Sequence, residues 1–258
     1  MDSVEPVAAF SDNYIWLLRD GDAAHVVDPG DAGPVLTALE ERGLALASIL
    51  VTHHHFDHVG GVAALKEASG CHVYGPGNPA IAGIDTRLAD GDRVAVGSYR
   101  FEVLAVPGHT LDHIAYYQGP QGDNPPLLFC GDTLFAGGCG RIFEGDPPQM
   151  YASLARLATL PAQTRVYCAH EYTLANLAFA RAADPHNGLL REREQQARAL
   201  RAAGTPTVPS TIDLERATNP FLRSDVAALR AGLEAAGRSA GEDPAATFAA
   251  LRAWKDSF

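Results

Sequence analysis

The sequence lacks the features that mark secreted and membrane proteins. Its four cysteines form no C-x-x-C pair, which argues against a disulfide framework or a thiolate zinc site and favours a reducing compartment. A membrane-spanning helix needs a run of about 18 apolar residues, and no apolar run in the sequence approaches that length. The start, MDSVEPVAAFSDNY, has no basic segment before an apolar run, so we expect no signal peptide. We therefore expect a cytoplasmic protein that does not enter a membrane.

Basic residues are also scarce. The 20 Lys and Arg are outnumbered by 31 Asp and Glu, which gives a formal net charge of −11. General nucleic-acid binding needs a basic stripe, so we expect no nucleic-acid partner. A small anionic ligand remains compatible, because a few local Arg and Lys can override the global charge. The 258 residues suit one main domain with a smaller appendage.

Short apolar runs alternate with loops through the first two-thirds of the chain. Runs rich in Val, Ile, Tyr and Phe and bounded by Gly, Pro or Asp are typical of strands, and we predict them at 14–20, 23–29, 47–53, 71–75, 93–97, 101–108, 114–118, 126–132 and 164–170. Helical patterns lie between some of them, at 34–42, 59–70 and 148–160. This alternation predicts an α/β layered fold with more than one sheet.

The character of the sequence changes after about residue 170. Segments rich in Ala, Leu and Arg with helical periodicity follow, at 173–184, 187–204, 224–237 and 243–256. The stretch GTPTVPST is the clear break among them. We therefore expect a first domain over 1–170 and a helical domain over 171–258.

Candidate metal ligands follow the ends of four predicted strands. The motif THHHFDH follows SILV, and His109, Asp132 and His170 follow VLAVPG, LLFCG and RVYCA. In layered α/β folds the loops after separate strands converge on one crevice. Imidazole and carboxylate together suit Zn, Fe or Mn. The pattern predicts a metal centre, against the alternative that THHHFDH is a solvated turn.

The spacing inside THHHFDH favours two metal ions. In an extended segment His53 and His55 project to one side and His54 to the other, so the first two, with His109, provide three ligands for one ion. Asp57 and His58 can begin a second site.

The remaining two ligands come from later strands. His170 would complete the second site, and Asp132, with two oxygens, is the natural bridge between the ions. Two ions about 3.5–4 Å apart can hold an attacking hydroxide and polarise a carbonyl or phosphoryl oxygen. Taken singly, Asp132 would be a turn residue. We interpret His113 as structural or as a residue that supports a metal ligand, and Asp28 as either a turn residue or an acceptor that orients a ligand histidine.

These motifs resemble those of a known family. THHHFDH matches the T-H-x-H-x-D-H signature of the metallo-β-lactamase superfamily, and GHT, GDT and AHE follow in that superfamily's order. SDNYIWLL, CGDTLFAGGCGRIFEG, VYCAHEYT, PTVPST, NPFLR and LRAWKD are similar to the glyoxalase II, or hydroxyacylglutathione hydrolase, family over essentially the whole chain. The resemblance implies an αββα sandwich capped by a helical C-terminal domain.

The resemblance also implies an activity and a ligand set. The family hydrolyses S-D-lactoylglutathione to glutathione and D-lactate, the second step of methylglyoxal detoxification. A hydroxide bridging two divalent ions attacks the thioester carbonyl, with Asp57 and Asp132 beside it. We expect the two ions to be zinc, with Fe or Mn as alternatives, and the protein to be a monomer. The implied metal ligands are His53, His55, Asp57, His58, His109, Asp132 and His170.

The implied glutathione-binding residues lie after Asp132 and in the helical domain. They are Arg141, Phe143, Tyr172, Arg252 and Lys255. Relatives with the fullest site have Lys-x-Tyr where this chain has Arg-Ile-Phe, so Phe143 lacks a hydroxyl and we expect a weaker hold on glutathione. A spacing of three places Arg252 and Lys255 on one helix face, able to bind one anion together.

Other functions fit less well. A lactonase would share the superfamily motif, and the single-iron persulfide dioxygenase has a reduced ligand set and lacks the helical domain. A β-lactamase would be secreted, and a ribonuclease-type member would be basic. A non-catalytic metal-binding or interaction protein would have no need of all seven ligands together with the basic residues.

Overall fold

The computed structural model describes residues 3–241 and 243–258, which form two compact units. Unit 1 contains the described residues up to Val106, together with Asp112–Gly131. Unit 2 contains Pro107–Leu111 and Asp132–Phe258. The chain therefore enters unit 2 for five residues, returns to unit 1, and enters unit 2 again.

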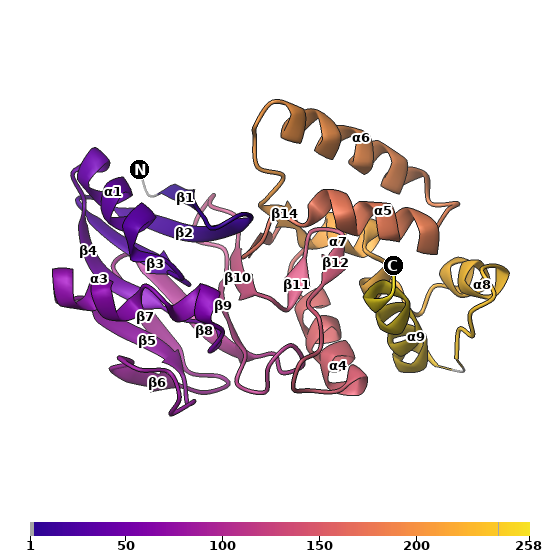
Figure 1. Ribbon diagram of the computed structural model, residues 1–258, viewed down its shortest axis with the longest axis horizontal. Helices are drawn as coiled ribbons and strands as arrows, with labels where there is room; N and C mark the ends of the chain where they lie inside the picture. The colour runs from indigo at the N-terminus through magenta and orange to yellow at the C-terminus, as the bar shows by residue number, and fades with distance from the viewer. Residues whose placement is uncertain (1–2, 242) are drawn as a thin grey trace. The chain divides into compact units, whose positions relative to one another are not determined.

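The first sheet of unit 1 has the strand order β1-β2-β3-β4-β5-β6 (Figure 1). Its strands are β1 (Ser3–Ala9), β2 (Asn13–Asp20), β3 (Ala23–Val27), β4 (Ala45–Leu50), β5 (His72–Pro76) and β6 (Thr86–Leu88). The first three strands are antiparallel and the last four run parallel. Parallel neighbours need a crossover, and the connections after β3 and β4 contain helices α1 (Ala32–Arg42), α2 (Phe56–Val59) and α3 (Val62–Ser69).

Helix α1 has clear start and stop signals. The Asp31 carboxylate accepts a hydrogen bond from the Gly33 N–H, and the helix ends at Gly43 in the left-handed conformation, with φ 62°. Its buried residues are Val35, Ala38 and Leu39. They pack with side chains of α3 and the first sheet in one apolar core, so α1 and α3 cover one face of that sheet (Figure 1).

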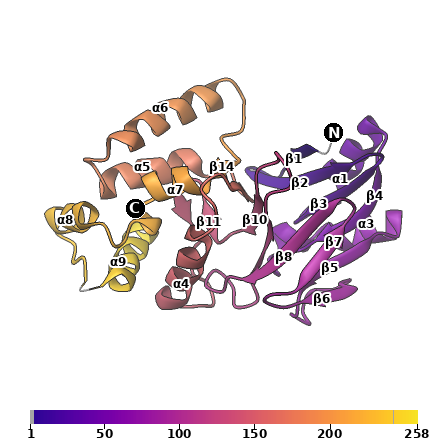
Figure 2. The same ribbon diagram turned by 180° about the vertical axis from the view of Figure 1, so that it is seen from behind.

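The second sheet of unit 1 is antiparallel (Figure 2). Its strands are β7 (Arg93–Val96), β8 (Tyr99–Ala105), β9 (Ile114–Gln118) and β10 (Leu127–Gly131). The Tyr116 hydroxyl donates to the Val51 carbonyl at 2.7 Å, and the Tyr99 hydroxyl donates to the Arg19 carbonyl at 3.1 Å. These bonds join the two sheets, so unit 1 is a sheet-on-sheet sandwich with helices on its outer face.

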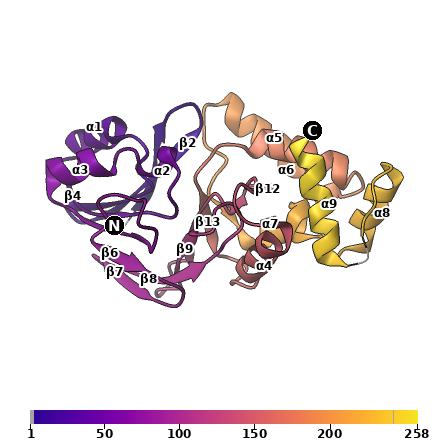
Figure 3. The same ribbon diagram turned by 60° about the horizontal axis from the view of Figure 1, so that its bottom comes forward.

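Unit 2 combines two short strand pairs with helices. The pairs are β11 (Leu134–Phe135) with β12 (Gly138–Cys139) and β13 (Arg165–Cys168) with β14 (Ser210–Thr211). The helices are α4 (Pro147–Ala158), α5 (Thr173–Ala183), α6 (Gly188–Ala202), α7 (Ile212–Thr218), the 3-10 turn η1 (Pro220–Leu222), α8 (Ala227–Ala235) and α9 (Pro244–Asp256). Helix α4 packs on α9, with the rings of Tyr151 and Phe248 6.0 Å apart (Figure 3).

Every predicted strand and helix is present in the structure, with shifted ends. Among the described residues, the elements that were not predicted are β1, β6, β11, β12, β14, α2, α7 and η1. Each is short or, like β1, contains a proline and two acidic or polar residues that mask its pattern. Among residues 3–241 and 243–258, no helix has the length and hydropathy needed to span a membrane.

Candidate metal centre

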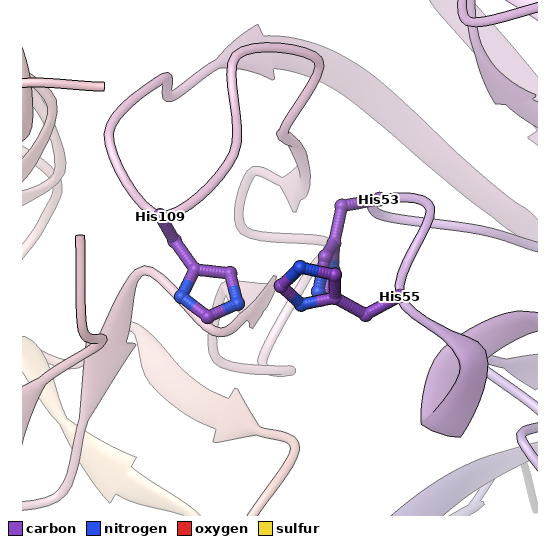
Figure 4. A group of neighbouring side chains, drawn as sticks. All are labelled: His53, His55 and His109. Carbon is purple, nitrogen blue, oxygen red and sulfur yellow. The ribbon is translucent and has the colours of Figure 1, made fainter. Parts of the chain in front are cut away.

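The four ligand candidates of THHHFDH lie on the loop after β4 and in helix α2. His55 occupies the N-cap position of this one-turn helix, which carries Asp57 and His58. Figure 4 shows His53 and His55 on the loop, and their ring centroids are 4.8 Å apart. The ring of His58 lies 4.1 Å from that of His53, and both side chains are fully buried. The extended segment and the short helix thus gather three imidazoles.

Asp28 orients this cluster from the end of β3. Its backbone is left-handed, with φ 53°, which aims the carboxylate at the start of the histidine loop. Oδ1 accepts the Thr52 N–H at 2.7 Å, while Oδ2 accepts the Thr52 hydroxyl at 2.7 Å and Nδ1 of His58 at 3.0 Å. Because a carboxylate only accepts, Nδ1 of His58 carries the proton and Nε2 carries the lone pair that a metal needs. Asp28 is therefore both a turn residue and an orienting acceptor.

The tautomer of His53 follows from the same bonds. The Thr52 hydroxyl gives its single proton to Asp28, so its oxygen accepts from Nδ1 of His53 at 3.0 Å. Nε2 of His53 therefore also carries the lone pair. His113 stacks on the other side of this ring at 4.5 Å and 15°, and it is 1% exposed. That position agrees with a structural role for His113.

Asn13, at the start of β2, orients Asp57. Its Nδ2 donates to Oδ2 of Asp57 at 2.9 Å, and the same Asp57 oxygen lies 3.5 Å from Nε2 of His58. Asn13 is buried, so its amide is held in place. The motif SDNY was part of the family resemblance, but sequence reasoning assigned Asn13 no role, because an asparagine at a strand start is usually a turn residue.

His54 faces a different partner from its neighbours. Its Nδ1 lies 2.9 Å from Oδ1 of Asp112, whose other oxygen accepts from Nδ2 of Asn78 at 2.9 Å. The alternation expected for an extended segment therefore separates His54 from His53 and His55.

Unit 2 places one carboxylate between two imidazoles. Oδ2 of Asp132 lies 3.3 Å from Nε2 of His109, and Oδ1 lies 3.4 Å from Nε2 of His170. All three residues are buried, at 6%, 3% and 4% exposed. One oxygen of Asp132 faces each histidine, so this carboxylate could contribute a ligand atom beside either imidazole.

Neighbouring groups fix both histidines. Nδ1 of His109 donates to the Arg141 carbonyl at 2.7 Å, so its Nε2 carries the lone pair. The Phe143 ring meets the His109 ring edge-on at 5.3 Å, and the Tyr172 ring stacks on His170 at 4.7 Å and 3°. Phe143 and Tyr172, expected to bind glutathione, are thus exposed residues whose rings contact candidate ligand histidines.

The expected basic residues differ strongly in exposure. Arg252 is 6% exposed, and its guanidinium donates to the Cys139 and Gly140 carbonyls at 3.1 and 3.4 Å and to Asp256 at 2.9 Å. Among the residues that the structure describes, its buried Nε has no hydrogen-bond partner. Arg252 therefore binds protein groups and lies beneath the surface, although its spacing from Lys255 fits one helix face.

Lys255 and Arg141 are more accessible. Nζ of Lys255 lies 5.5 Å from the Phe179 ring centroid, a cation–π contact. Burial lowers the pKa of Lys255, and the nearby Arg252 lowers it further. The side chain of Arg141 is 59% exposed, with Nε 3.6 Å from Asp256.

The family of the chain follows from comparison with known proteins. Residues 9–170 match the metallo-beta-lactamase superfamily, and residues 171–258 match the hydroxyacylglutathione hydrolase C-terminus. A protein named hydroxyacylglutathione hydrolase from Pseudomonas paraeruginosa is 55% identical over 261 residues, and one of the same name from Chromohalobacter salexigens is 54% identical over 260. Each comparison covers 100% of both chains. The chain belongs to the hydroxyacylglutathione hydrolase family.

Solved structures share the metallo-β-lactamase fold with this hydroxyacylglutathione hydrolase family member. ETHE1 from Myxococcus xanthus is 28% identical, with a TM-score of 0.64 over 100% of this chain and 99% of that chain. A di-iron-bound form of TTHA1623 is 30% identical, with a TM-score of 0.60 over 84% of this chain and 100% of that chain. The expected metallo-β-lactamase fold with a helical C-terminal domain is confirmed.

The donor set of this family member fits a divalent metal. Unit 1 offers three imidazoles and the Asp57 carboxylate, and unit 2 offers two imidazoles and the Asp132 carboxylate; donors of these two kinds suit Zn, Fe or Mn. The hydrogen bonds of Nδ1 in His53, His58 and His109 make Nε2 the nitrogen that could coordinate a metal. The residues present therefore match the group that the family implies.

Proposed function

We propose that the protein hydrolyses S-D-lactoylglutathione and related 2-hydroxyacylglutathione thioesters to glutathione and a 2-hydroxy acid. With the lactoyl thioester the acid is D-lactate, and the reaction is the second step of methylglyoxal detoxification. The observation that carries the proposal is similarity over the full length to proteins named hydroxyacylglutathione hydrolase. Asp132 between His109 and His170 supports it from the structure.

The proposed centre holds two divalent ions. Asp132 is shared, because its two oxygens face two different histidines. The remaining ligands are His53, His55 and His109 for the first ion, and Asp57, His58 and His170 for the second. We propose zinc, with iron and manganese as alternatives of the same donor preference. The similar TTHA1623 structure is described as di-iron-bound, which keeps iron among them.

The chain's own residues prepare the reaction. When bound, the ions would supply a Lewis acid for the thioester carbonyl and lower the pKa of a coordinated water to about 7. Asp28 and the Arg141 carbonyl keep His58 and His109 in the coordinating tautomer. Asn13 directs the Asp57 carboxylate. The leaving group is a thiolate, which departs without a dedicated general acid.

We propose that residues 171–258 form the substrate-binding domain and residues 1–170 the metal domain. Arg141, Tyr172 and Lys255 present accessible polar groups that suit the peptide and carboxylates of glutathione. We assign Arg252 to the same site, where its bonds to Asp256 and to the Cys139 carbonyl hold the loop that carries Arg141. Phe143 offers no hydroxyl, which weakens the site by one neutral hydrogen bond.

We also propose that the enzyme works as a cytoplasmic monomer without a nucleic-acid or membrane partner. All four cysteines are buried free thiols, as a reducing compartment allows. The acidic composition, with a net charge of −11, disfavours nucleic acid.

The test follows the ultraviolet absorbance of the thioester with S-D-lactoylglutathione as substrate. We expect hydrolysis by the purified protein, loss of hydrolysis after treatment with a chelator, and recovery on adding Zn²⁺. Elemental analysis should find about two metal ions per chain. Asp132→Asn should reduce both metal content and hydrolysis, whereas Asp85→Asn, which removes an exposed partner of Lys66, should change neither. Hydrolysis that chelators leave intact would overturn the proposal.

A further inference from the structure

After Asp132, each of the six residues 135–140 has a backbone group that is hydrogen-bonded by a side chain from elsewhere in unit 2. Residues 134–140, here called the 134–140 hairpin, contain β11 and β12 and lie between Asp132 and Arg141. Four side chains from the helical part of unit 2 bond this backbone: Asn176, Glu215, Asn219 and Arg252. Because every residue from Phe135 to Gly140 has such a bond, these side chains fix the conformation of the loop.

Five of these bonds are to backbone carbonyls and one is to a backbone N–H. Nδ2 of Asn219 donates to the Phe135 and Gly138 carbonyls at 3.2 and 2.8 Å. Oε2 of Glu215 accepts the Gly137 N–H at 2.8 Å. The remaining carbonyls, of Ala136, Cys139 and Gly140, accept from Asn176 at 3.2 Å and from Arg252 at 3.1 and 3.4 Å.

Glycines explain why such support is needed. Gly137 has φ +70°, and a Cβ on Gly138 would come within 2.6 Å of the Asn176 side chain. A Cβ on Gly140 would lie 1.9 Å from the Asp132 carbonyl oxygen and 3.2 Å from Nδ1 of His109. Glycine permits these close approaches but costs conformational entropy when it is ordered. The surrounding side chains must therefore supply the order.

Glu215 is the centre of the supporting network. It is fully buried, and its carboxylate accepts from Gly137, from Nδ2 of Asn219 at 3.1 Å, from Arg193 and from the Ser210 hydroxyl. A buried carboxylate is tolerated only when it is paired and fully hydrogen-bonded, and Arg193 provides the opposite charge. Glu215 thus connects α6, α7 and the 134–140 hairpin.

The hairpin adjoins all three metal-ligand candidates of unit 2. Asp132 and Thr133 directly precede it, and the Gly140 N–H donates back to the Thr133 carbonyl at 3.2 Å. The carbonyl of Arg141, the residue that follows the hairpin, accepts from Nδ1 of His109. The Phe135 ring meets the His170 ring edge-on at 5.8 Å.

We propose that Glu215 is a positioning residue for the metal centre. With Asn219 it fixes the 134–140 hairpin, and the hairpin fixes Asp132, His109 and His170 relative to one another. The inference rests on the proposed function only in taking these three residues as metal ligands. Its consequence is that metal affinity depends on a carboxylate that touches neither metal nor substrate.

The test is the affinity of the full-length protein for Co²⁺ and Zn²⁺, measured by competition with a chromophoric chelator, together with the visible spectrum of the Co²⁺ form. We expect Glu215→Gln to retain the far-ultraviolet circular dichroism of the wild type and to bind Co²⁺ about 10–100-fold more weakly, the usual effect of removing an outer partner of a ligand. The Co²⁺ spectrum should change as well, because the ligand geometry relaxes.

A matched control separates positioning from stability. Asp184 is another buried carboxylate of unit 2, paired with Arg223 at 3.1 Å and bonded by Asn187 at 3.0 Å. We expect Asp184→Asn to lower the melting temperature but to leave Co²⁺ affinity and spectrum unchanged. If Glu215→Gln does not fold, Asn219→Ala decides the question by the same measurements.

Two results would overturn the inference. One is wild-type Co²⁺ affinity in a folded Glu215→Gln or Asn219→Ala variant, and the other is an equal loss of affinity in Asp184→Asn. Neither measurement uses the thioester, so a protein that binds metal normally but does not hydrolyse S-D-lactoylglutathione would contradict the proposed function alone.

Discussion

The Asp28 carboxylate accepts a hydrogen bond from Nδ1 of His58 at 3.0 Å, and both residues are buried in unit 1. This bond selects the His58 tautomer that leaves Nε2 for coordination. An amide in place of the carboxylate would set its NH₂ group either against the Thr52 hydroxyl and Nδ1 of His58 or against the Thr52 backbone N–H. We therefore expect Asp28→Asn to bind Zn²⁺ about 10–100-fold more weakly, measured by chelator competition.

A neighbouring aspartate is the control for Asp28. Asp31 also lies near the end of β3, but its carboxylate caps α1 through the Gly33 N–H. Asparagine is as good a cap as aspartate, so Asp31→Asn should retain both metal affinity and stability. Equal zinc affinities for the two variants would contradict a role for Asp28 in orienting His58.

Restoring a hydroxyl at position 143 should strengthen glutathione binding. The side chain of Phe143 is 61% exposed and contacts the His109 ring by its edge, so a tyrosine fits the same place. One neutral hydrogen bond contributes about 0.5–1.5 kcal/mol, which corresponds to a fall in KM of about 2–12-fold. Steady-state kinetics of Phe143→Tyr check this, with kcat as the internal control. A large rise in KM would contradict our account of this loop.

Arg252 and Lys255 should respond differently to removal of their charge. Arg252→Met loses bonds to two carbonyls and to Asp256 in a buried setting, and we expect the free energy of unfolding to fall by about 2–4 kcal/mol. Burial lowers the pKa of Lys255, so its charge is held at a cost, and Lys255→Met should leave stability nearly unchanged. The KM of the Lys255→Met variant for the thioester should rise instead. Urea unfolding and steady-state kinetics of both variants distinguish the stabilising role of Arg252 from the substrate-binding role of Lys255. Equal free energies of unfolding for the two variants would contradict this assignment.

The buried thiols should be inert in the folded protein. Burial raises the pKa of Cys139 to about 11 and that of Cys168 to about 12. Between pH 7 and 9 the native protein should resist iodoacetamide, whereas the urea-unfolded chain, with thiol pKa values of about 8.5, should be alkylated at all four cysteines. Mass spectrometry reads the number of adducts.

The same shift affects stability in alkaline solution. At pH values between the unfolded and folded pKa, the thiols of Cys139 and Cys168 stay protonated in the folded protein and lose their protons in the unfolded chain. The stabilising contribution of Cys139 is therefore complete below about pH 8.5 and is lost as the pH rises towards 11. Rapid labelling of native Cys139 at pH 8 would contradict both statements.

Sequence reasoning found the candidate ligands because they lie where strands end. His109, Asp132 and His170 each follow an apolar run, and the structure brings these three together although they are far apart in the chain. The alternation of an extended segment likewise placed His54 apart from its neighbours. Such local rules depend only on the pleat and on strand ends, so they can be applied before the fold is known.

The orienting residues could not be found in this way. Asn13 and Thr52 are common residue types whose partners are fixed only when separate segments meet. The burial of Arg252 has a similar cause, because a spacing of three defines a helix face but not what that face packs against. Helix α7, which carries Glu215, has only seven residues and was too short for its period to show.

The five residues Pro107–Leu111 belong to unit 2 although unit 1 strands flank them on both sides. The Gly145 N–H bonds the Gly108 carbonyl at 3.2 Å, and the Ser153 hydroxyl bonds the Pro107 carbonyl at 2.7 Å. No single cut in the polypeptide can therefore release unit 2 with its own parts complete. A gene fragment that starts at Asp132 would encode unit 2 without His109. A fragment that ends at Gly131 would contain His109 but not the Arg141 carbonyl that accepts its hydrogen bond. For anyone who wishes to shuffle or truncate this enzyme, the unit to keep intact is the whole chain.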